Sequence, residues 1–380
     1  MLRPLIFAAI AAAAGCVETL PPLDETTSLA VELVAPADPG APDRRLDDSA
    51  RTVMLRVTAK DAQNQVDTGV TRTLRVYVQY LGSLTPAHDA ALPLATIDMT
   101  AGVTGVATVT LPPVFGPTTI WVEDNGPGGS FAAGTSPALW YREPTTADIS
   151  TPRDPMALDA LSASPLQNKQ VTVKTSRYGA RGRLVVTGTY AQGYSVSDAR
   201  CADDNGTPPC VSGDFDHVLV FSFSRPKDEE GRNIVAGQFI DGYAGGVSEF
   251  NGLTEMSFPQ SFVTDTSVDV ARIPTPPVVQ QAWLSNPIEF EKWESSPIAI
   301  ENATVCPLDD DYVTYKQWKL DLGRGCGSAI NVITNGVIDF DPATRVGQPV
   351  GRVVGILRPV NIGSFNVFII YPRDSADLVL

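Results

Sequence analysis

Short runs in which apolar and polar residues alternate set the strongest limit on the fold of this chain. Between Leu55 and Lys60 the two kinds alternate at every position, and Leu74, Val76 and Val78 repeat the pattern. A period of two is typical of a β-strand with one buried face. Turn-forming clusters such as 36–40 and 125–129 separate the runs, and the chain contains 31 Gly and 31 Pro. The pattern predicts an all-β protein of short strands and tight turns.

Residues 28–143 are predicted to form an antiparallel sandwich, because about seven short strands in a segment of this length is the usual layout of that fold. The clearest strand-like runs are 29–34, 53–59, 73–81, 107–111 and 119–123. The stretch from Gly105 to Trp121, with 133–137 before Trp140 and Tyr141, resembles Ig-like domains of bacterial surface lipoproteins. The resemblance implies an Ig-like sandwich.

Residues 144–165 lose the alternation and contain four prolines, so we predict a linker there. Within it, the run 156–161 suits one helical turn or a packed linker. Strand-like runs then return at 171–173, 183–190, 217–223, 233–240 and 253–258. Glycines in or beside these runs, among them Gly188 and Gly245, suit the bulges and sharp coiling of a small closed barrel.

Two stretches of the C-terminal half resemble OB-fold modules attached to secreted bacterial nucleases. The run 245–254 looks like a turn of those modules, and 355–357 followed by 365–378 looks like their closing strand. The resemblance implies one or two OB-like Greek-key barrels. We place the first at 166–275, and a connector with the second at 276–380. The nuclease catalytic domain has no counterpart in the sequence, so we expect no enzymatic activity, no cofactor and no metal.

The N-terminus is typical of an exported protein. Residues 1–15 carry one positive charge and an apolar run of ten residues, the parts of a signal peptide. Ala13-Ala14-Gly15-Cys16 resembles the bacterial lipobox. The resemblance implies that Cys16 is acylated, that 16–27 is a lipidated tether, and, since Val17 follows the cysteine, that the protein is sorted to the outer membrane. A plain secretory signal with an incidental cysteine is the alternative.

The other four cysteines agree with export, because disulfides persist outside the cytoplasm. Cys201, Cys210, Cys306 and Cys326 allow three pairings. We favour Cys201 with Cys210 and Cys306 with Cys326, because each pair then lies within one predicted domain. Four free thiols are the alternative. A zinc site is disfavoured, since the sequence has no Cys-x-x-Cys motif and neither of its two histidines lies at ligand spacing from a cysteine pair.

The formal net charge of −15 argues against a broad nucleic-acid surface, which needs a basic face. The best local candidate for ligand binding is a group of four cations around one aromatic residue. It consists of Lys174, Arg177, Tyr178, Arg181 and Arg183. Such a group suits a single strand of nucleic acid, whose bases stack on aromatic rings. We favour a solvated basic turn, so nucleic acid is not an expected partner.

Three further groups have both a functional and a structural interpretation. His217, beside Asp216, suits a general base, although a surface hydrogen-bonding histidine is favoured, and His88 lies in a loop. The acidic runs 203–205 and 309–311 suit calcium, although solvated turns are favoured. Aromatic side chains of the last hundred residues suit a carbohydrate platform or, more often, core packing. They are Trp283, Trp293, Trp318 and Tyr315.

Together these features predict an exported envelope lipoprotein with a non-catalytic binding or structural display role. Its expected partners are the membrane, through the lipid anchor, and a protein or polysaccharide of the envelope. The alternative is an accessory module that binds single-stranded nucleic acid or glycan during extracellular polymer degradation.

Overall fold

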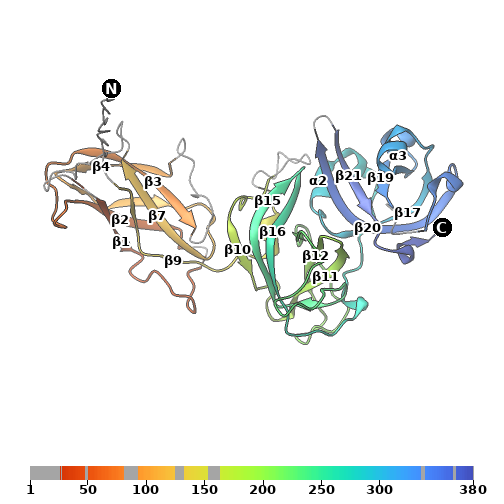
Figure 1. Ribbon diagram of the computed structural model, residues 1–380, viewed down its shortest axis with the longest axis horizontal. Coiled ribbons are helices and arrows are strands. Elements are labelled where there is room, and N and C mark those ends of the chain that lie inside the picture. The colour runs from red at the N-terminus through yellow and green to blue at the C-terminus, as the bar shows by residue number, and fades with distance from the viewer. Residues whose placement is uncertain are drawn as a thin grey trace, which may run out of the picture.

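The computed structural model describes residues 26, 28–47, 50–80, 93–124, 132–152, 163–334, 339–362 and 365–379. Three β-rich bodies follow one another along the longest axis of the molecule in chain order (Figure 1). The prediction of an all-β chain, with a sandwich followed by barrels, is confirmed. Cys16, the predicted signal peptide, His88 and the run 156–161 lie outside the described residues. Within those residues, no helix is long and apolar enough to cross a bilayer.

The first body is an antiparallel sandwich. Its strands are β1 (Ser28–Ala35), β2 (Thr52–Lys60), β3 (Arg72–Tyr80), β4 (Ala95–Thr100), β5 (Val103–Thr104), β6 (Ala107–Thr110), β7 (Pro117–Asp124), β8 (Gly134–Thr135) and β9 (Leu139–Trp140). They run in the order β1-β2-β5-β4-β3-β7-β8, and the sheet curls so that β1 also contacts β7 and β8. Leu55, Val57 and Ala59 of β2 are fully buried, as the alternation predicts.

The second body curls into a barrel. Its strands are β10 (Gln170–Val173), β11 (Gly182–Tyr190), β12 (Gly193–Arg200), β13 (His217–Phe221), β14 (Phe239–Ile240), β15 (Gly242–Phe250) and β16 (Leu253–Phe262). The order is β10-β15-β16-β13-β12-β11-β14. Only Asp241 separates β14 from β15, so the two act as one bent strand that pairs with β11 at one end and β16 at the other. This pairing brings the two ends of the sheet together.

The third body repeats that topology. Its strands are β17 (Pro297–Val305), β18 (Gln317–Asp321), β19 (Ile330–Ile333), β20 (Pro349–Ile362), β21 (Phe365–Tyr371) and β22 (Leu378–Val379), with α2 (Pro287–Glu291) before them and α3 (Asp310–Tyr315) between β17 and β18. The order is β17-β18-β19-β21-β20, and β20 pairs again with β17 to close the ring. In the first barrel β13 pairs in parallel with β16, and in the second β19 pairs in parallel with β21. This is the strand order of an OB-like Greek-key barrel.

One sequence prediction within the first barrel needs correction. The predicted strand at 233–240 is wrong except at its end, since only β14 (Phe239–Ile240) is extended and the preceding residues form a loop. The apolar residues there fill the barrel from a loop, for Ile234 is buried in the core. The run 245–254, which resembles a turn, does contain the turn of the hairpin of β15 and β16, and the tip of that hairpin is Asn251-Gly252. Both tip residues have positive φ, as a tight hairpin turn requires.

The segment between the sandwich and the first barrel is packed rather than free. Its helix α1 (Thr146–Ser150) buries Ile149 completely, and the Thr146 hydroxyl lies 3.0 Å from the Tyr243 hydroxyl of β15. Ile149 and Leu166 belong to one continuous apolar cluster that joins the sandwich and the first barrel, whereas the second barrel has its own core. The first two bodies are therefore coupled through the segment that we predicted as a linker.

Both predicted disulfides are present, between Cys201 and Cys210 and between Cys306 and Cys326. They are typical of a protein outside the reducing cytoplasm. Replacing Cys306 and Cys326 by alanine is expected to lower the free energy of unfolding by about 3 kcal/mol, because the bond closes a loop with a sequence separation of 20 residues. Chemical denaturation of the double variant measures this loss. An unchanged denaturation midpoint would contradict it.

Candidate functional site

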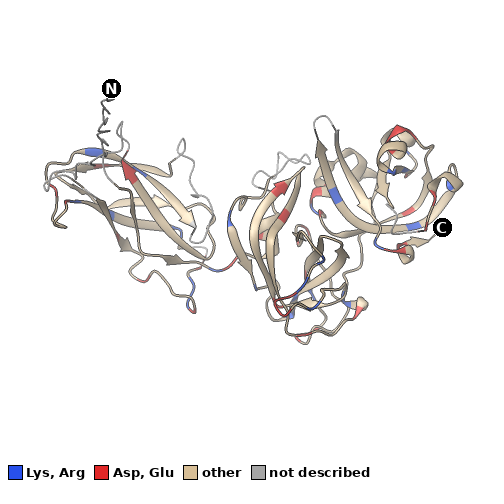
Figure 2. Cartoon of the chain, viewed as in Figure 1, with Lys and Arg blue, Asp and Glu red and all other residues tan. Residues whose placement is uncertain are grey.

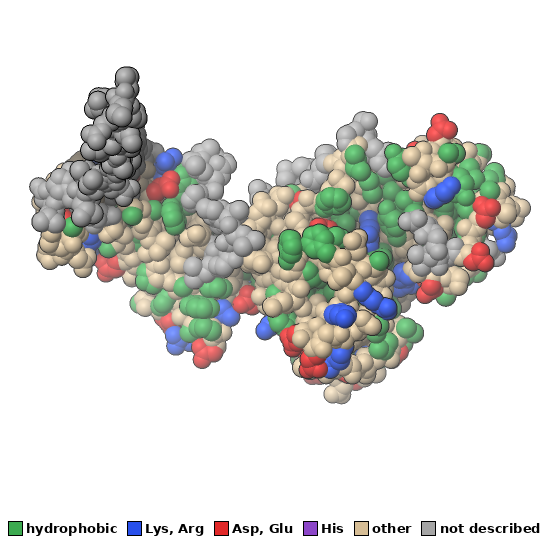
Figure 3. All heavy atoms as spheres, in the orientation of Figure 1, with side chains coloured by type: hydrophobic (Ala, Val, Ile, Leu, Met, Phe, Trp, Pro, Cys, Tyr) green, Lys and Arg blue, Asp and Glu red, His purple; other side chains and the backbone are tan. Residues whose placement is uncertain are grey.

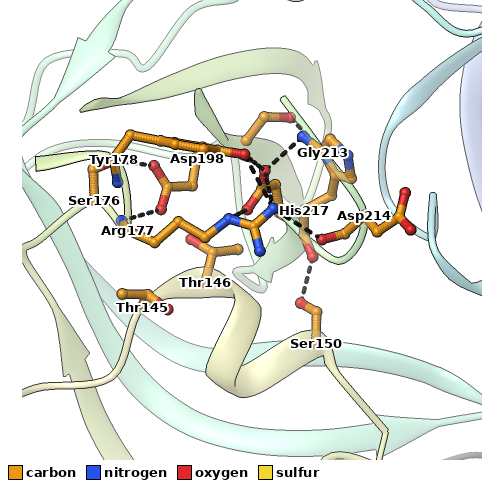
Figure 4. Close-up of polar contacts among 12 residues, drawn as sticks. Thr145, Thr146, Ser150, Ser176, Arg177, Tyr178, Asp198, Gly213, Asp214 and His217 are labelled. Carbon is orange, nitrogen blue, oxygen red and sulfur yellow. Dashed lines mark hydrogen bonds and ion pairs between the residues drawn. The ribbon is translucent and has the colours of Figure 1, made fainter. Parts of the chain in front are cut away.

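The predicted basic group does not form one binding surface. Arg177 and Tyr178 both converge on Asp216, a fully buried carboxylate (Figure 4). Arg177 Nε lies 2.7 Å from Asp216 Oδ1, and the Tyr178 hydroxyl donates to Oδ2 at 2.5 Å. The backbone N–H of Gly213 donates to the same Oδ2 at 2.6 Å. These two side chains therefore neutralise an internal anion instead of facing a ligand.

A second buried carboxylate lies in this network. Asp198 of β12 accepts hydrogen bonds from the Ser176 hydroxyl and, at 2.8 Å, from the Arg177 backbone N–H (Figure 4). Burial raises the pKa of Asp198 to about 6, and it also raises the pKa of Asp216. The network fastens the loop before β11 to the wall of the first barrel.

The other three members of the basic group have local partners, and two of them, Arg181 and Arg183, both contact Asp204. Arg181 forms an exposed ion pair with Asp204 at 3.7 Å. Arg183 donates to the carbonyls of Ala180 and Gly182. Lys174 lies over the ring of Phe262, 4.5 Å from its centroid. Sequence proximity alone suggested a common surface that the fold does not build.

His217 is buried, so the expectation of a surface histidine is wrong. Its side chain is 1% exposed, its Nδ1 lies 2.7 Å from the Ser197 hydroxyl, and its ring lies 5.3 Å from that of Trp293. Burial, together with the nearby charge of Arg177, lowers the pKa of His217 to about 3. A neutral imidazole closed off from solvent cannot serve as a general base for a bound ligand.

The acidic runs are used within their own loops. Asp203 accepts from the backbone N–H groups of Asn205 and Thr207, and Asp309 and Asp311 both pair with Lys319. Across the described ranges, no group of three or more His, Cys, Asp or Glu is arranged to hold a metal ion. The geometry of these loops offers no support for calcium.

The four aromatic residues do not share one platform. Trp318 is buried and packs against Phe340, whereas Trp283 meets the edge of Phe290. Trp293 contacts His217 of the first barrel, and Tyr315 is 63% exposed on α3. Their positions favour packing over carbohydrate recognition.

A cleft between the two barrels is a better candidate for a binding site. Its volume is about 680 Å³. The first barrel contributes the β11–β12 turn, with Tyr190, and the loop after β13, with Arg225. The second contributes the end of β19, Arg358 of β20, and the segment from Tyr371 to Arg373 that follows β21. The cleft lies within the range of small-molecule sites, about 300–1,000 Å³.

The barrels approach closely at the edge of this cleft. Arg373 Nη1 donates to the Thr187 carbonyl of β11 at 2.9 Å. Gly188, at a bulge in β11, leaves room for this contact, because a Cβ there would lie 3.3 Å from Ile356 and 3.4 Å from Arg373. The Asn361 backbone N–H of β20 also donates to Asn251 of the β15–β16 turn. These contacts position the two walls of the cleft.

Arg358 has an unusual environment in the cleft. Its guanidinium carbon lies 4.0 Å from the ring centroid of Tyr190 and 5.2 Å from that of Tyr371. Its Nε is buried and has no hydrogen-bond partner among the described residues. Arg358 interacts electrostatically with Glu255, but the hydrogen bonds that Glu255 accepts, at 3.3 Å, come from Ser248 and Ser257. The aromatic faces hold this cation in place.

The two other arginines of the cleft differ from each other. Arg373 forms a bidentate pair with Asp377, with its Nε 2.8 Å from Oδ2 and its Nη2 2.6 Å from Oδ1. Arg225 is exposed on the loop after β13. No Asp or Glu occurs among the described residues that line the cleft, and basic side chains lie along the junction of the two barrels in Figure 3. The lining is therefore positive on an acidic protein.

The first barrel also exposes two neighbouring aromatic side chains, Phe223 and Phe258. Phe223 is 65% exposed two residues before Arg225, and its ring lies 5.1 Å from that of Phe258, which is 71% exposed. Large exposed aromatic residues grouped in this way are typical of a binding surface.

Buried carboxylates also meet where the barrels join. Glu249 accepts from the Thr254 hydroxyl, and Glu294, just after α2, accepts from the Thr254 backbone N–H at 2.8 Å. Burial and the charge of Glu291 raise the pKa of Glu294 well above its usual range. These carboxylates do not line the cleft, and the hydrogen bond that Glu294 accepts holds the segment after α2 against the β15–β16 hairpin.

Sequence reasoning missed the cleft, since its residues come from six stretches between 189 and 373 that share no motif. Comparison of the chain with protein-family models found no match, and comparison with curated proteins found none either.

Proposed function

We propose that this protein is an exported, lipid-anchored envelope protein with a non-catalytic binding role, and that the cleft between its barrels is the binding site. The observation that carries the proposal is the cleft itself: two separately closed barrels supply opposite walls, with arginine and tyrosine side chains between them. Sites for small ligands occur preferentially at such domain interfaces.

The chemistry of the described titratable groups supports a binding role over a catalytic one. The imidazole of His217 is buried and bonded to Ser197, and Asp216 is paired with Arg177. Each acts within the wall of the first barrel. The cleft instead presents arginines, which stay protonated and serve as anchors for anions and not as proton carriers.

The envelope location rests on the two disulfides and on the N-terminal sequence, with its lipobox-like Ala13-Ala14-Gly15-Cys16. Replacing Cys16 by serine is expected to release folded protein from the membrane fraction, because the apolar cores of the three bodies are built from residues after the tether. Fractionation, mass analysis of the native N-terminus and protease shaving of whole cells measure anchoring and exposure together. Retention of the variant in the membrane fraction would contradict the proposal.

An array of single-stranded oligonucleotides and polysaccharides, tested at low and high salt, separates this role from that of an accessory to polymer degradation. We expect the polymers to bind weakly or not at all, since the Lys and Arg positions are scattered over all three bodies (Figure 2) and the net charge of the chain is −15. Salt-sensitive binding of a polymer at micromolar protein would favour the accessory role instead.

A further inference from the structure

We propose that the cleft binds an oxyanion, a carboxylate or phosphate group, carried on a small ring-bearing molecule, and that Arg358 is its anchor. The inference rests on the proposed binding role and specifies the ligand. The first argument is charge: three arginines and no described acidic residue line the cleft of a chain with a net charge of −15. A pocket lined by one sign of charge concentrates ligands of the opposite sign.

The second argument is the unsatisfied state of Arg358. A buried N–H without an acceptor is costly, and a guanidinium normally offers its N–H groups to a carboxylate or phosphate in a bidentate pair. Arg373, which lines the same cleft, shows the satisfied arrangement with Asp377. Arg358 has two tyrosine faces and a buried Nε in place of such a carboxylate. A ligand oxyanion in the cleft would give this guanidinium the charged partner that Arg373 already has in Asp377.

The third argument concerns the size and the apolar part of the ligand. The arginines share the lining with Pro226, Ile234, Ile333 and Pro372, so the ligand must present an apolar surface as well as a charge. A ring with one oxyanion fits both demands, as a uronic acid or a sugar phosphate does. A polyanion does not, since it would need a basic face that continues beyond the cleft.

The test uses isothermal titration of the full mature chain with four probes: digalacturonate, glucose 1-phosphate, uridine monophosphate and neutral maltotriose. We expect at least one of the anionic probes to bind and maltotriose not to bind. The anionic arms distinguish carboxylate from phosphate, and sugar from nucleoside. Replacing Arg358 by methionine should weaken the binding by about 10- to 100-fold, the usual effect of removing a charged hydrogen bond.

The matched control is the replacement of Arg352 by methionine. Arg352 lies on the same strand, pairs with Glu301 and does not line the cleft, so affinity should be unchanged. Thermal melting without ligand tests whether the role of Arg358 is purely structural. The melting temperature of the Arg358 variant should shift by no more than about 3 °C. A larger loss of stability with unchanged affinity would overturn the inference.

Failure of this inference can be told from failure of the binding role. A third variant, Ala191→Trp, places a large side chain at the exposed turn that lines the cleft. If maltotriose binds and only this variant abolishes the binding, the oxyanion inference is wrong and the cleft remains the binding site. If anionic probes bind equally to the Arg358 variant, or if none of the four binds at about 10 mM, where even weak sites are occupied, the inference is likewise overturned.

Discussion

Replacing Arg177 by alanine is expected to lower the free energy of unfolding by about 3 kcal/mol at neutral pH, because it removes the cation from a buried ion pair. Asp216 is fully buried, and Arg177 contacts both of its carboxylate oxygens. The loss lies at the low end for a buried pair, since Tyr178 and Gly213 still donate to the carboxylate and the Arg177 side chain is 36% exposed. Denaturation of the purified variant in urea measures it.

Arg181 provides the matched control, because it lies four residues further along the same predicted basic group. Its ion pair with Asp204 is exposed on both sides, so Arg181→Ala should change the free energy of unfolding by less than about 1 kcal/mol. Combining Arg177→Ala with Asp216→Asn should cost less than the sum of the two single changes, because no buried charge is left alone. Equal losses for Arg177→Ala and Arg181→Ala would refute the role assigned to the buried network.

Acidification is expected to destabilise the protein through His217, by about 3 kcal/mol between pH 7 and pH 4. Burial lowers the pKa of His217 to about 3 in the folded state. The unfolded chain takes up the proton near pH 6.5, whereas the folded chain does not. The stability that depends on the neutral imidazole is therefore complete above pH 6.5 and is lost as the pH falls toward about 3.

The His217→Gln variant isolates this effect, because glutamine keeps a polar side chain and does not titrate. The free energy of unfolding of the wild type, minus that of the variant, should decrease by about 3 kcal/mol from pH 7 to pH 4. Asp198 acts in the opposite direction: its folded pKa of about 6 lies above the unfolded value, so its contribution is complete below that value and is lost as the pH rises through 6. Both proteins contain Asp198, so its effect cancels. Parallel pH profiles would show that His217 is not held neutral.

Several strands were predictable because a local pattern determines them. In β2, β3 and β11 the strand bounds agree with the predicted runs to within one residue at each end. Strand β12 (Gly193–Arg200) was missed, since seven of its eight residues are buried although they include polar ones such as Ser195, Ser197 and Asp198. Buried polar residues that bond to distant partners leave no alternating pattern to detect.

Residues of the predicted basic group have different environments in the fold, for a similar reason. Arg177 and Arg181 look equivalent in the sequence, but only Arg177 lies beside the carboxylate of Asp216, 39 residues away. Conversely, Tyr190 and Arg358 come from different barrels and meet at 4.0 Å. Spacing along the chain carries no information about such contacts.

By itself the sequence determined that the chain is built from short β-strands, that its cysteines pair within the two barrels, and that its N-terminus has the parts of an export signal. These properties depend on neighbouring residues or on the closure of short loops, so a local pattern is enough to reveal them. The tertiary structure alone decided which cations are neutralised, that His217 is buried, and where the two barrels leave a cleft. Those properties depend on burial and on charges brought together by folding, and neither is encoded in the spacing of the residues that provide them.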